Sequence, residues 1–173
     1  MEMSHFYVLD AGVLFSSWTV RVPEGKFVTT SSVLEEVKNR PSRVRAEILA
    51  LLDRLHEDHA TPESIKTVKL AADKTGDKSV LSDVDIEIVA LAHTKKSLGM
   101  RTTLVSTDLA VLNTARHLGL TILDPSGRFK HEIVWSLKCP ACYHKSNSKA
   151  KELECPVCGT IMRRVVHRKR KSR

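Results

Sequence analysis

Apolar residues along the first 130 positions follow two alternating patterns. Short continuous runs, such as Phe6–Leu9, are typical of strands that are covered on both faces in a parallel sheet. They predict strands at residues 5–9, 26–29, 102–105 and 120–123. Between them, apolar positions three and four apart predict helices near residues 31–38, 42–57, 62–74, 82–98 and 108–118. This alternation predicts an α/β fold in which helices flank a parallel sheet.

The pattern changes near residue 130, just after turn residues at 124–127. We therefore expect two domains, residues 1–130 and a small second domain at 131–173. Charge divides the chain at nearly the same place. Residues 1–133 hold 17 Lys and Arg against 18 Asp and Glu, whereas residues 134–173 hold 11 against 2.

A near-neutral body with a cationic end favours a polyanionic partner, most simply nucleic acid, although a basic extension can also serve only solubility. The basic run from Arg163 to Arg173 is expected to be mobile without a partner. The residues expected to contact the nucleic acid are Lys138, Arg163, Arg164, Arg168, Lys169, Arg170 and Lys171.

Four cysteines lie close together near the end of the chain, as Cys139-Pro-Ala-Cys142 and Cys155-Pro-Val-Cys158. No apolar stretch is long enough to cross a bilayer and no signal peptide is visible, so we expect a cytoplasmic protein. In a reducing compartment such cysteines are metal ligands more often than disulfide partners. Two paired knuckles complete a closed shell, which predicts one structural zinc in preference to a redox pair.

Acidic residues at four separated positions fall at a predicted strand end or in predicted helices. Asp10 follows the first strand, whose carboxyl end is where open α/β sheets bind ligands. Glu36, Asp85 and Asp108 each share a helical face with apolar residues, as Asp85 does with Ile88. We therefore expect all four acids to point inward.

Neighbouring acids differ under the same test. Asp83 shares a face with Glu87, and Glu35 shares one with Ser31 and Asn39, so Asp83 and Glu35 are predicted to face solvent. Any single inward acid could simply cap a helix or complement its dipole. Four unpaired inward carboxylates are costly, and a shared divalent cation relieves that cost. The pattern therefore favours a metal site.

Four segments together form a recognisable set of motifs. They read Val8-Leu9-Asp10-Ala11-Gly12, Ser32-Val33-Leu34-Glu35-Glu36-Val37, Lys74-Thr75-Gly76-Asp77 before Leu81-Ser82-Asp83-Val84-Asp85-Ile86, and Ser106-Thr107-Asp108. These motifs resemble the PIN-domain nucleases. With the four-cysteine ribbon, almost the whole chain is similar to the archaeal PIN endonucleases that mature the 3′ end of small-subunit ribosomal RNA.

The resemblance implies a PIN-like fold with a zinc ribbon, and metal-dependent cleavage of precursor ribosomal RNA in the small ribosomal subunit. By match of motif, one or two Mg²⁺ or Mn²⁺ ions would be held by Asp10, Glu36, Asp85 and Asp108. Cations held there stabilise the attacking and leaving oxygens, so no side-chain nucleophile is needed. No small-molecule cofactor and no membrane are expected.

Two matched positions keep open roles. The family often has Gln-Asn after the fourth acid where this chain has Leu112-Asn113, and Asp77 could be a turn residue or a helix cap. Two other functions also stay open. A toxin-type PIN ribonuclease has the same acids but normally lacks a ribbon, and a non-catalytic RNA-binding adaptor would do better without four acids facing phosphate.

Overall fold

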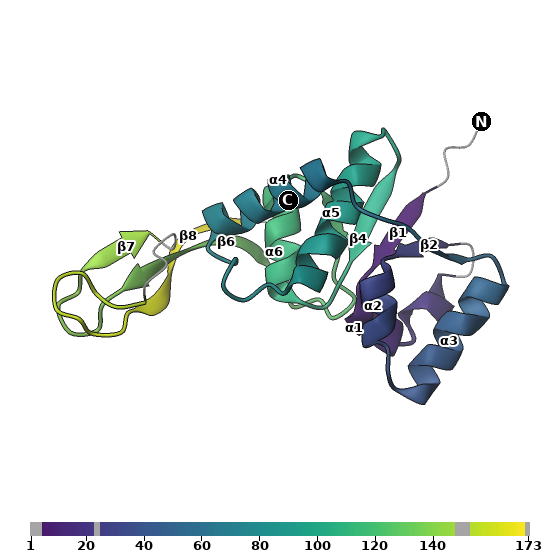
Figure 1. The fold of residues 1–173 in the computed structure, drawn as a ribbon, viewed down its shortest axis with the longest axis horizontal. Helices are drawn as coiled ribbons and strands as arrows, with labels where there is room; N and C mark the ends of the chain where they lie inside the picture. Colours follow the sequence, from purple (N-terminus) through teal and green to yellow (C-terminus); the bar gives the residue numbers. More distant parts are fainter. Residues whose placement is uncertain (1–4, 23–24, 148–152, 172–173) are drawn as a thin grey trace.

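The computed structural model describes residues 5–22, 25–147 and 153–171, and it consists of a parallel sheet with helices followed by a smaller antiparallel sheet (Figure 1). In chain order the elements are β1 (Phe6–Leu9), α1 (Ala11–Phe15), the 3-10 helix η1 (Trp18–Arg21), β2 (Lys26–Thr29), α2 (Ser31–Glu36), α3 (Arg40–Leu51), β3 (Leu55–Glu57), α4 (Pro62–Thr75), α5 (Asp83–Ser97), β4 (Thr102–Val105), α6 (Leu109–His117), β5 (Thr121–Leu123), β6 (His131–Lys138), β7 (Lys145–Asn147) and β8 (Arg163–Lys171).

The first sheet confirms the predicted α/β class. Its five strands are all parallel, in the order β3-β2-β1-β4-β5. The central strands carry the core, where Val8, Leu9, Phe27 and Leu104 are almost fully buried. Helices α4, α5 and α6 pack against one another, and α5 also packs on β1 and β4 (Figure 1). We call residues 5–123 the body.

One predicted helix is wrong at its C-terminal end. The pattern predicted a helix over residues 42–57, but α3 ends at Leu51 and Leu55–Glu57 form β3. Asp53 adopts a left-handed backbone conformation with φ 54°, and the Arg54 amide bonds back to the Leu49 carbonyl at 2.9 Å, which closes the helix. β3 then pairs with β2. The spacing of apolar residues along the chain could not indicate this pairing.

The second sheet corrects another expectation. Arg163–Lys171, expected to be mobile, forms β8 along almost the whole length of β6, and the sheet order is β7-β6-β8. Antiparallel pairing with β6 gives the basic segment a partner within the chain. Residues 172–173, the end of that basic run, lie outside the described residues. We call β6 and β8 together the arm, which projects from the body and has the cysteine turns at its far end (Figure 1).

No helix in the described part of the chain is long and apolar enough to span a lipid bilayer.

Candidate active site

Asp10 lies where the strand order of the parallel sheet reverses. From β1 the chain adds β2 and β3 on one side, then crosses to add β4 and β5 on the other. The carboxyl ends of β1 and β4 flank this switch point, where open α/β sheets bind ligands. The Asp10 amide donates to the Val105 carbonyl at 3.1 Å, which ties the two strand ends together.

The Asp10 carboxylate is fixed on both oxygens. Its Oδ1 accepts a hydrogen bond from the Ala11 amide at 2.7 Å, and its Oδ2 accepts one from the Ser106 hydroxyl at 2.6 Å. The residue is only 7% exposed. Burial raises the pKa of Asp10, and the negative charges of Asp85 and Asp108 raise it further, against the two hydrogen bonds that lower it. Asp85 and Asp108 are therefore each close enough to Asp10 to repel its charged form.

Asp85 reaches this cluster from the first turn of α5. Its Oδ2 accepts hydrogen bonds from the amide and the hydroxyl of Ser82, which completes the N-terminal capping of the helix. Its Oδ1 accepts no hydrogen bond within the described residues. Asp83 has a side chain that is 98% exposed, opposite Lys69, which confirms that Asp83 faces solvent.

Asp108 caps the N-terminus of α6. Its Oδ1 accepts from the amides of Ala110 and Val111, and its Oδ2 accepts no hydrogen bond within the described residues. Gly12 allows the Asp108 segment to approach α1, because a Cβ at residue 12 would lie 2.7 Å from Thr107 Oγ1. Asp108 therefore caps α6, and its charge also acts on Asp10.

Glu36 lies further out than predicted. It is the last residue of α2 and is exposed, and Asp108 is also exposed, so the expectation of four inward acids is wrong for these two. The helical-face argument fails for Glu36 because α2 ends there, and for Asp108 because its carboxylate turns to the helix amides. Glu36 lines a shallow cavity of about 500 Å³ together with Glu35 and Val84, the residue before Asp85.

Both Glu35 and Glu36 line that cavity, so the geometry does not choose between them. Another cavity, of about 770 Å³, lies between α2 and α3. It includes Glu35 but none of the three aspartates Asp10, Asp85 and Asp108.

Asp77 and Asn113, whose roles the motifs left open, form a buried hydrogen-bonded network with the arm. Asp77 is 2% exposed and accepts from Asn113 Nδ2 at 2.5 Å and from Arg164 Nη2 at 3.0 Å. Asn113 also accepts from the Ile133 amide at 2.7 Å and donates to the Ile133 carbonyl at 2.7 Å. This network joins α6 and the end of α4 to both strands of the arm. The spacing of apolar residues gives no indication of this network. Only the family motifs pointed to Asp77 and Asn113.

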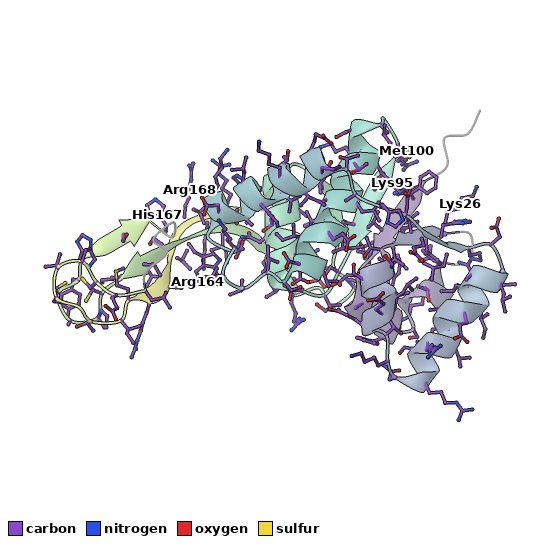
Figure 2. The ribbon with its side chains drawn as sticks, in the orientation of Figure 1. Lys26, Lys95, Met100, Arg164, His167 and Arg168 are labelled. Carbon is purple, nitrogen blue, oxygen red and sulfur yellow. The ribbon has the colours of Figure 1, made fainter. Side chains whose placement is uncertain are left out.

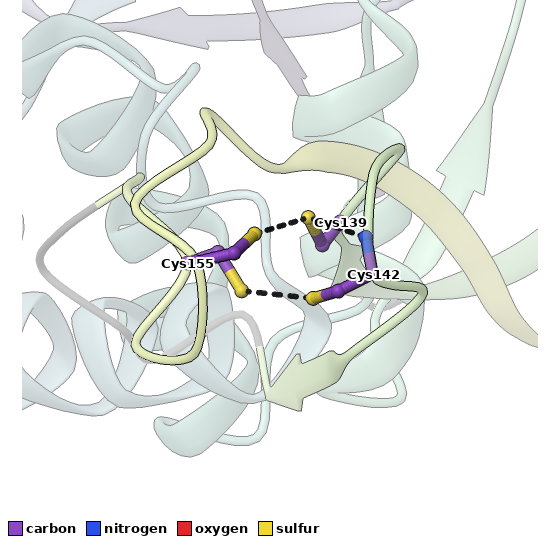
Figure 3. Close-up of side chains that lie close together, drawn as sticks. Cys139, Cys142 and Cys155 are labelled. Atoms are coloured by element: carbon purple, nitrogen blue, oxygen red, sulfur yellow. Dashed lines mark hydrogen bonds between the residues drawn. The ribbon is translucent and has the colours of Figure 1, made fainter.

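The four predicted zinc ligands come together at the end of the arm. Figure 3 labels three of them, Cys139, Cys142 and Cys155. All four sulfurs lie within 4.8 Å of one another, and the Cys139–Cys158 and Cys142–Cys155 pairs are each 3.5 Å apart. A tetrahedron with metal–sulfur bonds of about 2.3 Å has edges of about 3.8 Å, so the spacing fits one zinc ion. No comparable group of three carboxylates occurs within residues 5–22, 25–147 and 153–171.

Short turns build this cysteine site. The Cys139 amide donates to the His144 carbonyl at 2.8 Å, and the Cys155 amide donates to the Thr160 carbonyl at 2.9 Å. Gly159 adopts φ 72°, a left-handed conformation that glycine takes without a steric penalty. A small apolar core supports the turns; it consists of Leu137, Met162 and the buried residues Cys139 and Cys155.

The residues expected to contact RNA belong to β6 and β8, the two strands of the arm, where Figure 2 labels Arg164 and Arg168. Four of them on β8 are exposed: Arg163, Arg168, Lys169 and Arg170. Arg164 differs, because it is paired with Asp77 and its guanidinium lies 4.5 Å from the Trp135 ring centroid. Lys138 lies over the Tyr143 ring at 5.0 Å. Lys171 belongs to β8, but its side chain is not described.

Comparison with known proteins gives one family model and several relatives. The model described as the PIN domain of ribonuclease matches residues 7–95. Endoribonuclease Nob1 of Pyrococcus abyssi is 33% identical over 94% of this chain and 95% of its own length. Ribonuclease VapC1 of Thermoplasma acidophilum is 32% identical over 95% of this chain and 80% of its own length. The 20S-pre-rRNA D-site endonuclease nob1 of Schizosaccharomyces pombe is 33% identical over 53% of this chain and 23% of its own length.

Proposed function

Because this chain belongs to the PIN-domain endoribonucleases of the Nob1 type, we propose that it cleaves precursor small-subunit ribosomal RNA at its 3′ end, with divalent cations at the acid cluster. The observation that carries the proposal is the cluster at the switch point of the sheet. There the Ser106 hydroxyl donates to the buried Asp10 carboxylate and accepts from the Asp108 amide at 3.0 Å, and the charges of Asp85 and Asp108 raise the pKa of Asp10. The name of the Schizosaccharomyces relative, 20S-pre-rRNA D-site endonuclease, supports a ribosomal precursor as the substrate. The cytoplasm is the proposed location.

The donor set suits a hard cation. Mg²⁺ and Mn²⁺ prefer carboxylate oxygens, and crowded carboxylates gain most from positive charge. Asp10, Asp85 and Asp108 would hold the ion or ions, and Asp85 and Asp108 each keep one oxygen free of hydrogen bonds within the described residues. Glu36, at the rim formed by α2, would complete the set. Bound there, a divalent cation supplies the charge that activates water and stabilises the leaving oxygen.

The protein groups around Asp10 have a positioning role in this proposal. The Ser106 hydroxyl and the Ala11 amide hold the carboxylate in one orientation, and the capping bonds of Asp85 and Asp108 hold theirs. Such preorganised ligands need no rearrangement when charge develops on the scissile phosphate. Cleavage by water would leave a 5′ phosphate and a 3′ hydroxyl.

We propose a division of labour along the chain. Residues 1–130 form the nuclease domain, and residues 131–173 form a ribbon that holds one structural zinc and contributes RNA affinity through its basic residues. A closed shell of four thiolates leaves no open position for chemistry, so the zinc would not take part in cleavage.

The likeness to ribonuclease VapC1 spans 95% of this chain and therefore includes the cysteine region. The ribbon alone consequently does not separate a ribosomal-RNA endonuclease from a toxin-type ribonuclease. The substrate assay separates them, and it also separates either enzyme from a non-catalytic adaptor.

The test is incubation of the purified full chain with RNA that spans the small-subunit 3′ boundary, with Mn²⁺ and with chelator. A matched RNA of the same length and composition, with the boundary sequence scrambled, is the control. Cation-dependent cleavage at the boundary, absent from the scrambled RNA and from Asp10→Asn, is expected. Equal cleavage of both RNAs would indicate a general ribonuclease, and binding without cleavage would indicate an adaptor.

A further inference from the structure

A cavity of about 350 Å³ lies between α6, the segment after β5, and the arm. Leu109, Ala110 and Ile133 contribute apolar surface to it, and Phe129 and Trp135 contribute aromatic rings. Small-molecule sites in proteins have volumes of roughly 300–1,000 Å³ and combine apolar walls with a few polar groups. The cavity is therefore of a size for one flat, partly apolar group.

The rim of this cavity is cationic. Lys130 and Lys169 line it and are both exposed, and within the described residues neither ammonium has a hydrogen bond or an ion pair. Arg164 also lines the cavity, but Asp77 balances its charge at 3.0 Å. The uncompensated charge is consequently positive, which suits a phosphate group beside the flat one.

The cavity adjoins the acid cluster. Leu109 and Ala110 directly follow Asp108, and the Ala110 amide that bonds to Asp108 Oδ1 belongs to the same first turn of α6. On the other side, Arg128 donates from Nη2 to the Thr107 carbonyl at 2.9 Å. A group bound in the cavity would thus lie next to the segment that carries one of the proposed cation ligands.

The orientation of Trp135 is set by its surroundings. Arg164 lies over the indole with 4.5 Å between the guanidinium carbon and the ring centroid, and Asp77 anchors Arg164 in turn. Trp135 nevertheless remains partly exposed and contributes to the cavity wall. An aromatic ring that is fixed before binding loses little conformational freedom when a base stacks on it.

We propose that this cavity binds one nucleotide of the single-stranded RNA substrate, with the base against Trp135 and Phe129 and a phosphate at Lys130 and Lys169. The inference deepens the proposed function, because it gives the acid cluster an adjacent substrate subsite. Aromatic stacking and lysine contacts to phosphate are general features of single-strand binding. The combination of aromatic walls with an unpaired cationic rim favours a nucleotide over an uncharged peptide segment.

The first test uses Trp135 fluorescence in the zinc-loaded full chain. The chain contains two tryptophans, so Trp18→Phe leaves Trp135 as the sole reporter, and Asp10→Asn prevents cleavage during titration. Stacking of a base should quench the Trp135 emission as a short single-stranded RNA is added. Unchanged emission at RNA concentrations that saturate binding would overturn the inference and leave the cavity to a protein segment.

The second test compares two charge-matched double variants across several salt concentrations. Lys130→Gln/Lys169→Gln should weaken RNA binding by roughly tenfold and reduce the logarithmic salt slope by about 0.7, since the two lysines share one phosphate and each phosphate contact with a single strand contributes about 0.7. Lys26→Gln/Arg101→Gln is the control, because exposed Lys26 begins β2 and exposed Arg101 directly precedes β4, at the amino ends of the parallel strands. Figure 2 shows Lys26 away from the arm. Equal slopes in the two variants would contradict the proposal.

A scan with abasic nucleotides tests the base. One position of the RNA should lose roughly tenfold or more in affinity when its base is removed, and that loss should disappear in Phe129→Leu and in Trp135→Leu. Losses that persist in both variants would show that the base binds elsewhere. The outcome is separable from the cleavage proposal. If the RNA is not cut but still quenches Trp135 and shows the slope change, the cleavage proposal is refuted and the subsite is retained. If the RNA is cut without either signal, the subsite is refuted and the cleavage proposal is retained.

Discussion

The two metal sites proposed for this chain are built in opposite ways. The cysteine site draws all its ligands from residues 139–158, and its four sulfurs already lie within 4.8 Å of one another. The acid cluster draws Asp10, Asp85 and Asp108 from segments separated by β2–β3 and by β4, and its carboxylates are spread more widely. One site is made by local turns, and the other by the order of strands in a sheet.

This difference indicates what each site is suited for. A closed set of four soft ligands on a small core holds an ion as part of the fold. A looser set of hard ligands at a sheet edge, two of them with an oxygen free of hydrogen bonds within the described residues, suits an ion that is shared with a substrate phosphate. The buried network of Asp77, Asn113 and Arg164 joins the two regions mechanically.

The largest expected effect is on RNA cleavage, when the acid cluster is changed and the cysteine site is left intact. Asp10→Asn should reduce cation-dependent RNA cleavage by at least about a thousandfold, since stabilisation by a metal supplies several kcal/mol. Zinc content and RNA affinity should be unchanged. Asp83→Asn is the matched control on the exposed face of α5 and should cleave normally. Equal losses in both variants would show that the acid cluster is not the catalytic site.

The same substitution should not destabilise the fold in the absence of divalent cations. Burial raises the pKa of Asp10, so its ionised form is disfavoured in the folded protein. That penalty is absent below the ordinary pKa of an aspartate and grows as pH rises through the raised pKa. At neutral pH, urea unfolding should therefore find Asp10→Asn at least as stable as the parent chain. A clear loss of stability would mean that the hydrogen bonds from Ala11 and Ser106 stabilise the fold by more than the buried charge costs.

Metal removal tests the closed character of the cysteine site. Freshly purified, reduced protein should contain one zinc per chain. It should keep that zinc under mild chelation that is already sufficient to stop cleavage. Cys155→Ser should lose the ion and unfold the cysteine turns, while the parallel sheet stays folded, because binding energy at such sites is also folding energy. His144→Ala should keep its zinc. Backbone NMR and metal analysis distinguish these outcomes from a global collapse.

A smaller effect is expected when the hydrogen bonds between the body and the arm are removed. Asn113→Ala leaves the Ile133 amide and the buried Asp77 carboxylate each without one partner, at a cost of about 1–3 kcal/mol in the free energy of unfolding. Trp18 reports on the body and Trp135 on the arm. When Asn113 is present, the urea transition seen at Trp18 and the one seen at Trp135, each measured in a single-tryptophan variant, should coincide. Separate transitions in the parent chain would show that the arm and the body are independent.

The smallest effect concerns the outer surface of the arm. Arg168→Gln/Arg170→Gln should raise the dissociation constant for RNA by a few-fold and lower the salt slope by about 1.4, with no change in stability. Both side chains are exposed, and both residues lie on β8 opposite alternate residues of β6, so they share a face. An unchanged slope would restrict RNA binding to the cavity beside α6 and to the body.

Local signals in the sequence were enough for much of the structure. Continuous apolar runs located β1, β2, β4 and β5, because a strand covered on both faces has few positions for polar residues. α5 begins within one residue of the helix predicted at residues 82–98, with Ser82 as its cap, and the spacing of the cysteines predicted their assembly. The exposure of Asp83 followed from helical periodicity alone. In each case the relevant interactions span only a few residues.

Only the tertiary structure decided the rest. β3 and β8 were read as a helix end and a mobile tail because their strand character comes from pairing with β2 and β6. The ion pair of Arg164 with Asp77 joins residues 87 positions apart, so no periodicity could indicate it. Glu36 and Asp108 proved exposed because helix ends and capping bonds orient those side chains. Sequence patterns encode what neighbours along the chain do to one another, whereas side chains brought together by the sheet depend on the path of the whole chain.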